Sequence, residues 1–498
     1  MCGIIGVYSC EGNAVEKTLM GLKDLEHRGQ EGAGLAWSTP EKVSVIKDFV
    51  SVDILRGMCK GINGNIAIGH TRYSTTGDSC DKRNLQPIDN PYHHYSAIAH
   101  NGNLVNTVEL KELLLSWGIT EGELAEYSSS DTGLIAALIH HDGLLNHDGL
   151  NIRERLKEAM KDHLKGAYSI VINTRSKLIA TRDAYGIRPL FIARTNNDKI
   201  IIIASETCAF RLFEDIDSIE EVKPGEMIVI EDGRIHREQV IEPQPRAFCI
   251  FEWIYFARPD SIFDGQEVWK IREDLGRALA AECNANLSFL KRAVLRIAKG
   301  LSVTLGIKPN RIVTSVPDSG TPASVGFFEE YVYPCRHTQS LLKVRGMRTF
   351  LGPDETLRRR SVREKLAGLI TNIFKQVLEI VDDSIVRGHT SKEIVGALKQ
   401  SGADEVHMKV HSPSIKWPCF YGIDTQPEEE LIASHNTIEG IRAFLGANSL
   451  TYLSEEGMCS VVPNSDKCCK ACFTGEYPIP IPEEVPTKDI LDKVKTEA

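Results

Sequence analysis

The sequence lacks any apolar run long enough to cross a lipid bilayer. Its N-terminus lacks the basic stretch followed by an apolar stretch that a secretory signal peptide requires. A positive net charge is missing too, because 58 Lys and Arg against 68 Asp and Glu leave −10 at pH 7. Such an acidic balance argues against a nucleic-acid-binding surface over the whole protein. We therefore expect a cytoplasmic protein that binds neither membranes nor nucleic acid.

What the sequence does contain is typical of a globular protein. Its 498 residues are 42% hydrophobic and 25% charged, and this length predicts two domains, each with its own core. The thirteen cysteines are an odd number in a chain without an export signal. In a reducing compartment such cysteines are core residues, metal ligands or catalytic thiols rather than disulfides.

The sequence pattern changes near residue 235. Residues 1–235 alternate short β-rich runs with helical stretches at 13–29 and 130–146. Residues 236–476 instead contain strands followed by long helices, which predicts an α/β domain with a parallel sheet and ligands at the strand C-termini. Residues 477–498 are rich in Pro and charge and predict a loosely held C-terminal extension.

The opening "MCGIIGV" places Cys2 immediately before an apolar strand. Four interpretations compete: a small core residue, a lipidation site, half of a disulfide, or a nucleophile. A small residue at position 2 permits removal of Met1, after which Cys2 would carry a free α-amino group beside its own thiol. That group could serve as the base for the thiol.

A set of polar residues follows that suits a glutamine site. Such a site needs a guanidinium for the α-carboxylate, a carboxylate for the α-ammonium, and donors around the amide carbonyl. The candidates are Arg28, Arg72, Asn101, Gly102 and Asp131. Taken singly, Asp131 could be a helix N-cap, and Asn101 with Gly102 a hairpin turn.

The motifs "MCGIIGV", "HRGQEGAG", "HTRYSTTG", "HNGNL", "RDAYGIRPLF" and "ASETCAF" resemble the glutaminase domain of class II amidotransferases, which are N-terminal nucleophile hydrolases. This resemblance implies an α+β fold, an αββα sandwich of two antiparallel sheets. It implies that Cys2 attacks the glutamine amide while Asn101 and the N–H of Gly102 hold the oxyanion. Arg72 would bind the substrate carboxylate and Asp131 its ammonium, with Arg28 among the glutamine-binding residues.

In the second half, "VLEIVDDSIVRGHT" is an apolar strand that ends in Asp382 and Asp383, followed by a loop that opens a helix. The two acids could be simple helix-capping residues, or they could hold ribose hydroxyls and a divalent cation while the loop binds a phosphate. The longer string resembles the phosphoribosyl pyrophosphate signature of phosphoribosyltransferases. "SVPDSGTPASVGF" and "RAFCIFEWIYFARPDS" resemble further segments of one branch of that family.

The order of the two domains resembles that of the glutamine phosphoribosylpyrophosphate amidotransferase family. The resemblance implies that ammonia from glutamine displaces pyrophosphate from phosphoribosyl pyrophosphate in purine biosynthesis. It implies Mg²⁺ at Ser319, Asp382 and Asp383, and a homotetramer inhibited by purine nucleotides. The implied phosphate and pyrophosphate ligands are Ser384, Arg387, Gly388, His389 and Thr390, with Lys343, Arg345 and Arg348 from the basic stretch "LLKVRGMRTF". A solvated charged loop is the simpler interpretation of that stretch.

Cysteine spacing indicates a metal site. "KCCKACF" contains the C-x-x-C pair Cys469 and Cys472, which needs two more ligands for a tetrahedral thiolate site. Some relatives carry a 4Fe-4S cluster on four cysteines in matching segments, so the resemblance implies Cys249 and Cys419 as the other two ligands. Zinc on the same thiolates is the alternative, and Cys468 could replace Cys469.

The sequence departs from its relatives at three places. The loop reads "KVRG" and is one residue short, His389 stands where a small hydroxyl residue is usual, and residues 286–309 are additional. We expect weaker loop closure, so that some ammonia escapes. Three alternatives stay open: an amidotransferase with another acceptor, a degenerate paralogue that retains only glutaminase activity, or a non-catalytic regulatory protein.

Overall fold

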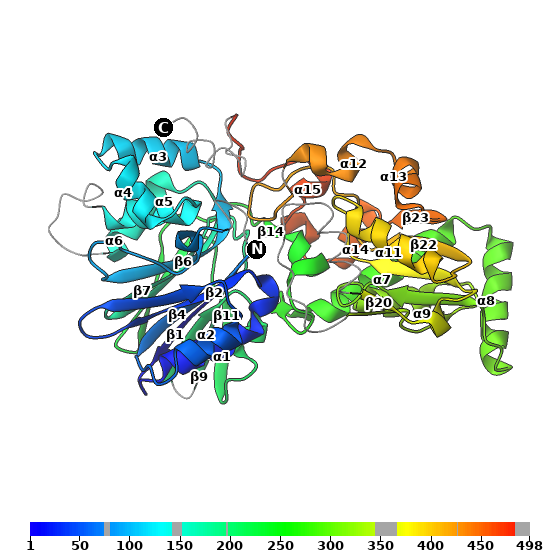
Figure 1. Cartoon of the computed structure of the whole chain (residues 1–498), viewed down its shortest axis with the longest axis horizontal. Helices are drawn as coiled ribbons and strands as arrows, with labels where there is room; N and C mark the ends of the chain where they lie inside the picture. The colour runs from blue at the N-terminus through cyan, green and yellow to red at the C-terminus, as the bar shows by residue number, and fades with distance from the viewer. Residues whose placement is uncertain (74–79, 142–151, 196–197, 344–365, 426, 484–498) are drawn as a thin grey trace.

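Two stacked antiparallel β-sheets form the core of the N-terminal lobe (Figure 1). The computed structural model describes residues 1–73, 80–141, 152–195, 198–343, 366–425 and 427–483. The seven-stranded sheet has the order β11 (Ile216–Glu221), β9 (Phe191–Thr195), β10 (Ile200–Ala204), β1 (Gly3–Ser9), β4 (Ile66–Arg72), β2 (Gly32–Ser38), β3 (Val43–Asp48). The six-stranded sheet has the order β13 (Arg234–Gln239), β12 (Glu226–Glu231), β8 (Lys177–Arg182), β7 (Gly166–Thr174), β6 (Ser96–Leu104), β5 (Ile88–Asp89).

Helices cover the outer face of each sheet. Those on the seven-stranded sheet are α1 (Ala14–Asp24) and α2 (Val52–Met58). Those on the six-stranded sheet are α3 (Thr107–Ser116), α4 (Glu121–Tyr127), α5 (Asp131–His140) and α6 (Ile152–Glu158). This arrangement confirms the predicted αββα sandwich.

Strand β1 shows why the sequence takes this layered form. Every residue from Gly3 to Ser9 is buried, because both faces of the strand are covered. Ile5 and Val7 pack on the helix side, whereas Ile4 and Tyr8 pack between the two sheets. A near-continuous apolar run is the pattern that a strand buried on both faces requires.

The C-terminal lobe is built on a parallel sheet, as predicted. Its order is β18 (Arg336–His337), β17 (Arg311–Ser315), β21 (Val377–Asp382), β22 (Glu405–Val410), β23 (Ser449–Tyr452), and all four pairings are parallel. Its helices are α7 (Val268–Ala285), α8 (Phe289–Thr304), α9 (Thr321–Glu330), α11 (His389–Gln400), α12 (Ile432–His435), α13 (Ile438–Leu445), α14 (Glu455–Val461) and α15 (Ala471–Thr474). Within the described ranges, no helix is both long and apolar enough to span a membrane.

Three short two-stranded pairings complete the fold. They are β14 (Phe248–Cys249) with β24 (Cys468–Cys469), β15 (Ile262–Phe263) with β16 (Gln266–Glu267), and β19 (Leu341–Lys343) with β20 (Leu366–Gly368). The first pairing is parallel and joins the start of the second lobe to its last segment. The packed chain also continues past residue 476, because the Tyr477 hydroxyl donates to the Pro418 carbonyl (2.6 Å) and Ile479 is buried.

Candidate active site

Cys2 lies at the start of β1, next to the end of β4 and to β6. Its backbone N–H donates to Oδ1 of Asn101 (3.3 Å), and its thiol donates to the Tyr73 carbonyl (3.5 Å). Burial raises the pKa of the Cys2 thiol, so the sulfur is not a thiolate in its own right at neutral pH. A nucleophile at this position therefore requires an adjacent base.

Asn101, whose Oδ1 accepts the Cys2 N–H, and Gly102 both lie inside β6, so the hairpin-turn interpretation is wrong. Among the described residues, the buried Nδ2 of Asn101 has no hydrogen-bond acceptor. Gly102 has φ +148°, and a Cβ there would lie 2.0 Å from the Ala167 carbonyl oxygen, so only glycine fits. A buried amide donor without an acceptor next to a thiol is what an oxyanion hole needs.

Asp131 and Arg72 lie close to the same strand. Asp131 is the first residue of α5, and its Oδ2 accepts the N–H of Leu104 in β6 (3.1 Å), while Ser130 occupies the N-cap position. Arg72 ends β4, and its Nε lies 4.0 Å from Oε2 of Glu31. Arg72 thus lies close enough to Cys2 to oppose the rise of its thiol pKa, and Asn101 contacts Cys2 directly. Asp131 is held to β6, the strand that carries Asn101 and Gly102.

Arg28 also approaches Cys2, but it contacts the backbone of that residue. Its Nε donates to the Cys2 carbonyl (2.9 Å). The rest of the buried guanidinium pairs with Glu252 (2.8 Å and 3.0 Å) and with Glu206. These contacts favour a positioning role for Arg28 over the predicted contact with glutamine. They also link Cys2 to Glu252, which belongs to the second half of the chain.

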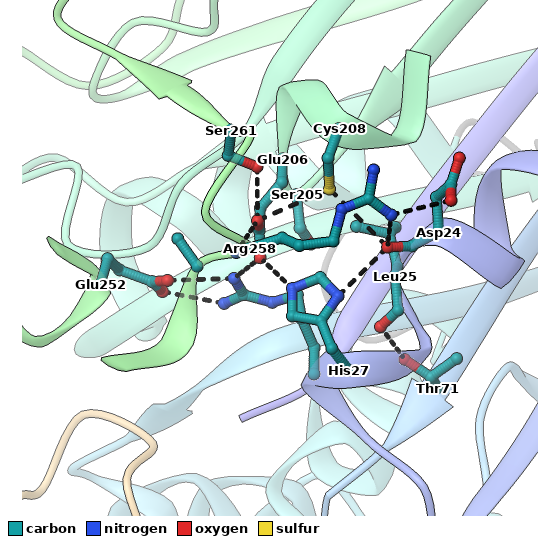
Figure 2. Close-up of polar contacts among 12 residues, drawn as sticks. Asp24, Leu25, His27, Thr71, Ser205, Glu206, Cys208, Glu252, Arg258 and Ser261 are labelled. Atoms are coloured by element: carbon teal, nitrogen blue, oxygen red, sulfur yellow. Dashed lines mark hydrogen bonds and ion pairs between the residues drawn. The ribbon is translucent and has the colours of Figure 1, made fainter. Parts of the chain in front are cut away.

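Glu206 is the centre of this cluster and of a second candidate site. His27, Glu206 and Cys208 bring ligand atoms within 4.8 Å of one another. However, Oε2 of Glu206 already accepts the Ser261 hydroxyl (2.6 Å) and the Arg258 N–H (2.8 Å) (Figure 2). Burial alone would raise the pKa of Glu206, but His27 and Arg28 hold it well below its usual range. The cluster is a structural ion-pair network, since guanidinium and N–H donors occupy the places of a cation.

Replacing Glu252 by Gln should lower kcat for the expected glutamine hydrolysis about tenfold, because Arg28 would lose one charged partner and would hold the Cys2 carbonyl less firmly. Removing the negative charge of Glu252 leaves the buried Arg28 guanidinium less well paired and should also reduce thermal stability. Steady-state glutamate release measures the effect. Asp260→Asn is the control, because Asp260 pairs with Arg258 at an exposed position. An unchanged kcat in Glu252→Gln would contradict the positioning role.

The second predicted site lies at the C-terminal end of β21. Asp382 and Asp383 are buried there, and Asp382 Oδ1 accepts the N–H of Asp383 (3.0 Å). Burial and the neighbouring Asp383 raise the pKa of Asp382 well above its usual value. Two adjacent buried carboxylates of this kind fit a divalent cation, which would offset their repulsion.

The loop after Asp383 leads into α11 as predicted. Ser384 donates to Oδ1 of Asp383 (2.5 Å), and Gly388 has φ +77° at the N-cap of α11. His389 begins that helix, with its ring edge-on to Phe444. The backbone N–H groups of this loop and of the helix N-terminus form a potential phosphate cradle.

The loop that contains Ser319 lies beside the same strand end. Val316 donates its N–H to the Val381 carbonyl (2.9 Å), and a Cβ at Gly320 would be 2.3 Å from that oxygen. Lys343, at the end of β19, pairs with Asp318 (2.9 Å) at an exposed position. Ser319 and Lys343 are therefore brought toward Asp382, whereas Arg345 and Arg348 lie outside the described residues.

Two tyrosines lie between the two sites, and sequence reasoning did not identify them. Burial and the nearby Asp424 raise the pKa of Tyr73 to about 12, and Arg387 of the phosphate loop lies close enough to oppose that shift. Desolvation and Asp383 raise the pKa of Tyr255, with Tyr73 as a further neighbour. Tyr73 belongs to "HTRYSTTG" and Tyr255 to "RAFCIFEWIYFARPDS", and no local pattern predicts that these two distant segments lie close together.

The four predicted cluster ligands line one small cavity. Cys249, Cys419, Cys469 and Cys472 surround it with Arg188, Tyr421 and Tyr477. Cys468 does not line the cavity, and its thiol instead donates to the Asn464 carbonyl (3.5 Å). Burial raises the pKa of Cys249 to about 11. The long-range partners Cys249 and Cys419 thus meet the local C-x-x-C pair.

The spacing of these sulfurs bears on which metal they could hold. Among the described residues, no three of the four cysteine sulfurs lie within 4.8 Å of one another. Tetrahedral zinc with bonds of about 2.3 Å needs sulfurs about 3.8 Å apart. An iron-sulfur cluster holds its thiolates farther apart, because each binds a different iron.

The cysteine cavity is connected to β6, the strand that carries Asn101 and Gly102. Nε of Arg188 donates to the Tyr421 carbonyl (2.7 Å), one residue before Gly422. A Cβ at Gly422 would lie 3.0 Å from the backbone of Gly102, and Asn103 Nδ2 reaches the Phe420 carbonyl (3.4 Å). Whatever orders residues 419–422 therefore supports the strand that carries Gly102.

Comparisons with known proteins match both halves. Residues 70–211 match the model of the glutamine amidotransferase domain family. The chain is 37% identical to the amidophosphoribosyltransferases of Synechococcus elongatus (98% of this chain, 94% of the relative) and Bacillus subtilis (100% and 98%). The solved glutamine phosphoribosylpyrophosphate amidotransferase from B. subtilis, complexed with ADP and GMP, superposes with a TM-score of 0.81 at 36% identity, covering 98% of this chain and all of that one.

Proposed function

The chain belongs to the amidophosphoribosyltransferases, and we propose that Cys2 is the nucleophile of its first reaction step. The protein uses glutamine to convert 5-phosphoribosyl 1-pyrophosphate to 5-phosphoribosylamine, with release of glutamate and pyrophosphate, in purine biosynthesis. The observation that carries the assignment of the nucleophile is the hydrogen bond from the Cys2 N–H to Oδ1 of Asn101 (3.3 Å). It places Cys2 next to a side chain whose buried Nδ2 has no acceptor among the described residues, with Gly102 directly after it in β6.

In the proposed first step, the Cys2 sulfur bonds to the amide carbon of glutamine. The α-amino group of Cys2 takes the thiol proton and passes it to the nitrogen that leaves as ammonia. Nδ2 of Asn101 and the N–H of Gly102 stabilise the negative oxygen of the tetrahedral intermediate. Water then cleaves the thioester and releases glutamate. Arg72 and Asp131 would bind the α-carboxylate and α-ammonium of the substrate.

This step requires that Met1 be removed. With Met1 attached, the Cys2 nitrogen is an amide and cannot act as a base. Burial lowers the pKa of the Met1 amino group to about 5, which also makes this position unfavourable for a charged terminus. We expect an active preparation to have the intact mass of a chain that starts at Cys2, and a glutamine-like electrophile to modify Cys2 alone among the thirteen cysteines. Retention of Met1 in fully active protein would overturn this mechanism.

For the second step we propose that Asp382 and Asp383, with Ser319, hold Mg²⁺ against the sugar and pyrophosphate. When bound, the cation neutralises the charge of the leaving pyrophosphate. The backbone N–H groups from Ser384 to Thr390 would bind the 5-phosphate, with Arg387, Gly388 and His389 in that loop. Lys343, Arg345 and Arg348 would approach the pyrophosphate. Ammonia would pass between Tyr73 and Tyr255.

We further propose that Cys249, Cys419, Cys469 and Cys472 hold a 4Fe-4S cluster with a structural role. Support comes from the common cavity and from the finding that, among the described residues, no three of these sulfurs lie within 4.8 Å of one another. Arg188 supplies a cation to a group that carries negative charge. Such a group would fasten β24 and α15 to β14 and would order the segment next to Gly102.

Anaerobically purified protein should be brown and contain about four irons per chain. Removing the metal should reduce glutaminase activity, because residues 419–422 support the strand of Gly102. Iron analysis and the visible absorption spectrum measure this. Cys469→Ser should lose the iron, whereas the adjacent Cys468→Ser should keep it. Colourless protein with one zinc per chain would replace this proposal with the zinc alternative.

We also propose that purine nucleotides inhibit the enzyme, since the related B. subtilis structure was solved with ADP and GMP. A homotetramer and a cytoplasmic location stay predictions. No observation favours the degenerate-paralogue alternative, because both buried carboxylates and the loop into α11 are in place.

A further inference from the structure

Helix α8 carries an apolar stripe on its outer side. Leu290, Val294, Ile297 and Leu301 follow one another at spacings of four, three and four residues. Their exposed fractions are 73%, 55%, 64% and 52%. Figure 1 shows α8 at the outer edge of the molecule, on the side away from the N-terminal lobe. Alternating spacings of three and four residues make the seam along which two helices pack in a coiled coil.

The inner side of α8 is polar, which reverses the usual arrangement of a surface helix. Lys299 donates to the carbonyls of Phe328 (2.7 Å) and Tyr331 (2.8 Å). Arg296 pairs with Glu330 (3.4 Å). The helix is therefore held to the protein by its cationic side, while its apolar side has no cover within the described part of the chain.

Small residues flank the apolar stripe. Ala293 and Gly300 lie on one side of it, seven residues apart, and Ala298 lies on the other. A Cβ at Gly300 would meet nothing within 4 Å, so the fold of the single chain does not require glycine there. Glycine in a helix interior costs about 1 kcal/mol relative to alanine. Close approach of a second helix would explain a glycine at this position.

The positions of the charges on α8 favour a protein partner over a membrane surface. A helix that lies on a membrane carries Lys and Arg along the borders of its apolar face. Here those borders hold mainly small residues and one exposed cation, Lys291, whereas Lys299 and Arg296 are engaged by the protein's own carbonyls and Glu330. The apolar stripe with small borders matches the surface of another helix instead.

We propose that α8 packs antiparallel on α8 of a second copy of this chain. The antiparallel direction places Lys291, near the helix N-terminus, beside the negative C-terminal end of the partner helix. A parallel pair would instead set the two Lys291 side chains together. A two-fold axis would cross the pair near Ile297, the middle of the stripe, so that Ile297 contacts its own counterpart. This association does not depend on the proposed catalytic residues.

The first test measures the mass of the intact wild-type protein and of its variants in solution, by sedimentation velocity at micromolar concentration. Gly300→Leu should halve the mass, because the new side chain blocks close approach while leucine is the better helix former. Gly396→Leu is the matched control, since Gly396 is another helical glycine with open space around its Cβ, and it should leave the mass unchanged. Ile297→Glu should also halve the mass, whereas Val303→Glu, on the opposite side of α8, should not.

The second test fixes the direction of the pair by cross-linking with a short bismaleimide, with the unmodified protein as the baseline for native cysteines. Ile297→Cys should give a linked dimer. Leu290→Cys should not, because antiparallel packing separates the two copies of residue 290 by roughly the length of the stripe, on the order of 20 Å. An unchanged mass in both Gly300→Leu and Ile297→Glu would overturn the proposal. So would dimers linked through Leu290→Cys, or binding of the wild type to anionic vesicles that Ile297→Glu abolishes without a change in mass.

Discussion

Cys2→Ala is expected to lower glutaminase activity by on the order of 10⁴-fold or more, because we propose that Cys2 supplies both the nucleophile and its neighbouring base. The transferase half does not use the thiol. Pyrophosphate release with ammonium salts in place of glutamine should therefore continue at the wild-type rate. Glutamate and pyrophosphate are measured separately for each nitrogen source.

The matched control for this variant is Cys10→Ala. Cys10 follows β1 directly and its thiol is exposed, so its loss should change neither activity. Full glutaminase activity in Cys2→Ala would contradict the assignment of the nucleophile. Loss of the ammonia-dependent reaction as well would show that the substitution had damaged the fold.

The double variant Asp382→Asn with Asp383→Asn should lose pyrophosphate release by on the order of 10³-fold with both nitrogen sources, because the carboxylates that we propose to bind Mg²⁺ are gone. Basal glutaminase activity should persist, since Cys2 and its oxyanion donors are untouched. Asp404→Asn is the control, because Asp404 precedes β22 and lies at the opposite end of the sheet.

Stability should change in the opposite direction to activity. The pKa of Asp382 is raised in the folded protein, so the ionised group destabilises the fold once the pH rises above the ordinary carboxyl range. The double variant removes this charge and should melt at an equal or higher temperature than the wild type at pH 7 without Mg²⁺. An active double variant would refute the transferase site, and a variant that melts much lower would indicate misfolding.

The fold could be predicted from the sequence wherever a local pattern matched its environment. Strand β1 and strand β21 are both covered on two faces, and each therefore has the near-continuous apolar run that such burial requires. Asn101 and Gly102 were harder, because a polar residue followed by glycine is also typical of a turn. Only the pairing of β6 with β7 and the contact of Gly102 with Ala167 place them inside a strand.

The site depended on contacts between distant segments. The C-x-x-C pair is visible in the sequence, but Cys249 lies more than two hundred residues before it and joins through the pairing of β14 with β24. The role of Arg28 could not be predicted, because its partners Glu206 and Glu252 come from other elements. Likewise, the spacing of α8 predicts an amphipathic helix but not which face points outward.

We infer that one chain couples glutamine hydrolysis at Cys2 to displacement of pyrophosphate at Asp382 and Asp383. The most direct measurement is the amount of glutamate formed against pyrophosphate released in the same reaction with glutamine. We expect both products, with glutamate in modest excess because the shortened "KVRG" loop lets some ammonia escape. Glutamate formed from glutamine with no pyrophosphate, together with no pyrophosphate from ammonium salts, would contradict this coupling.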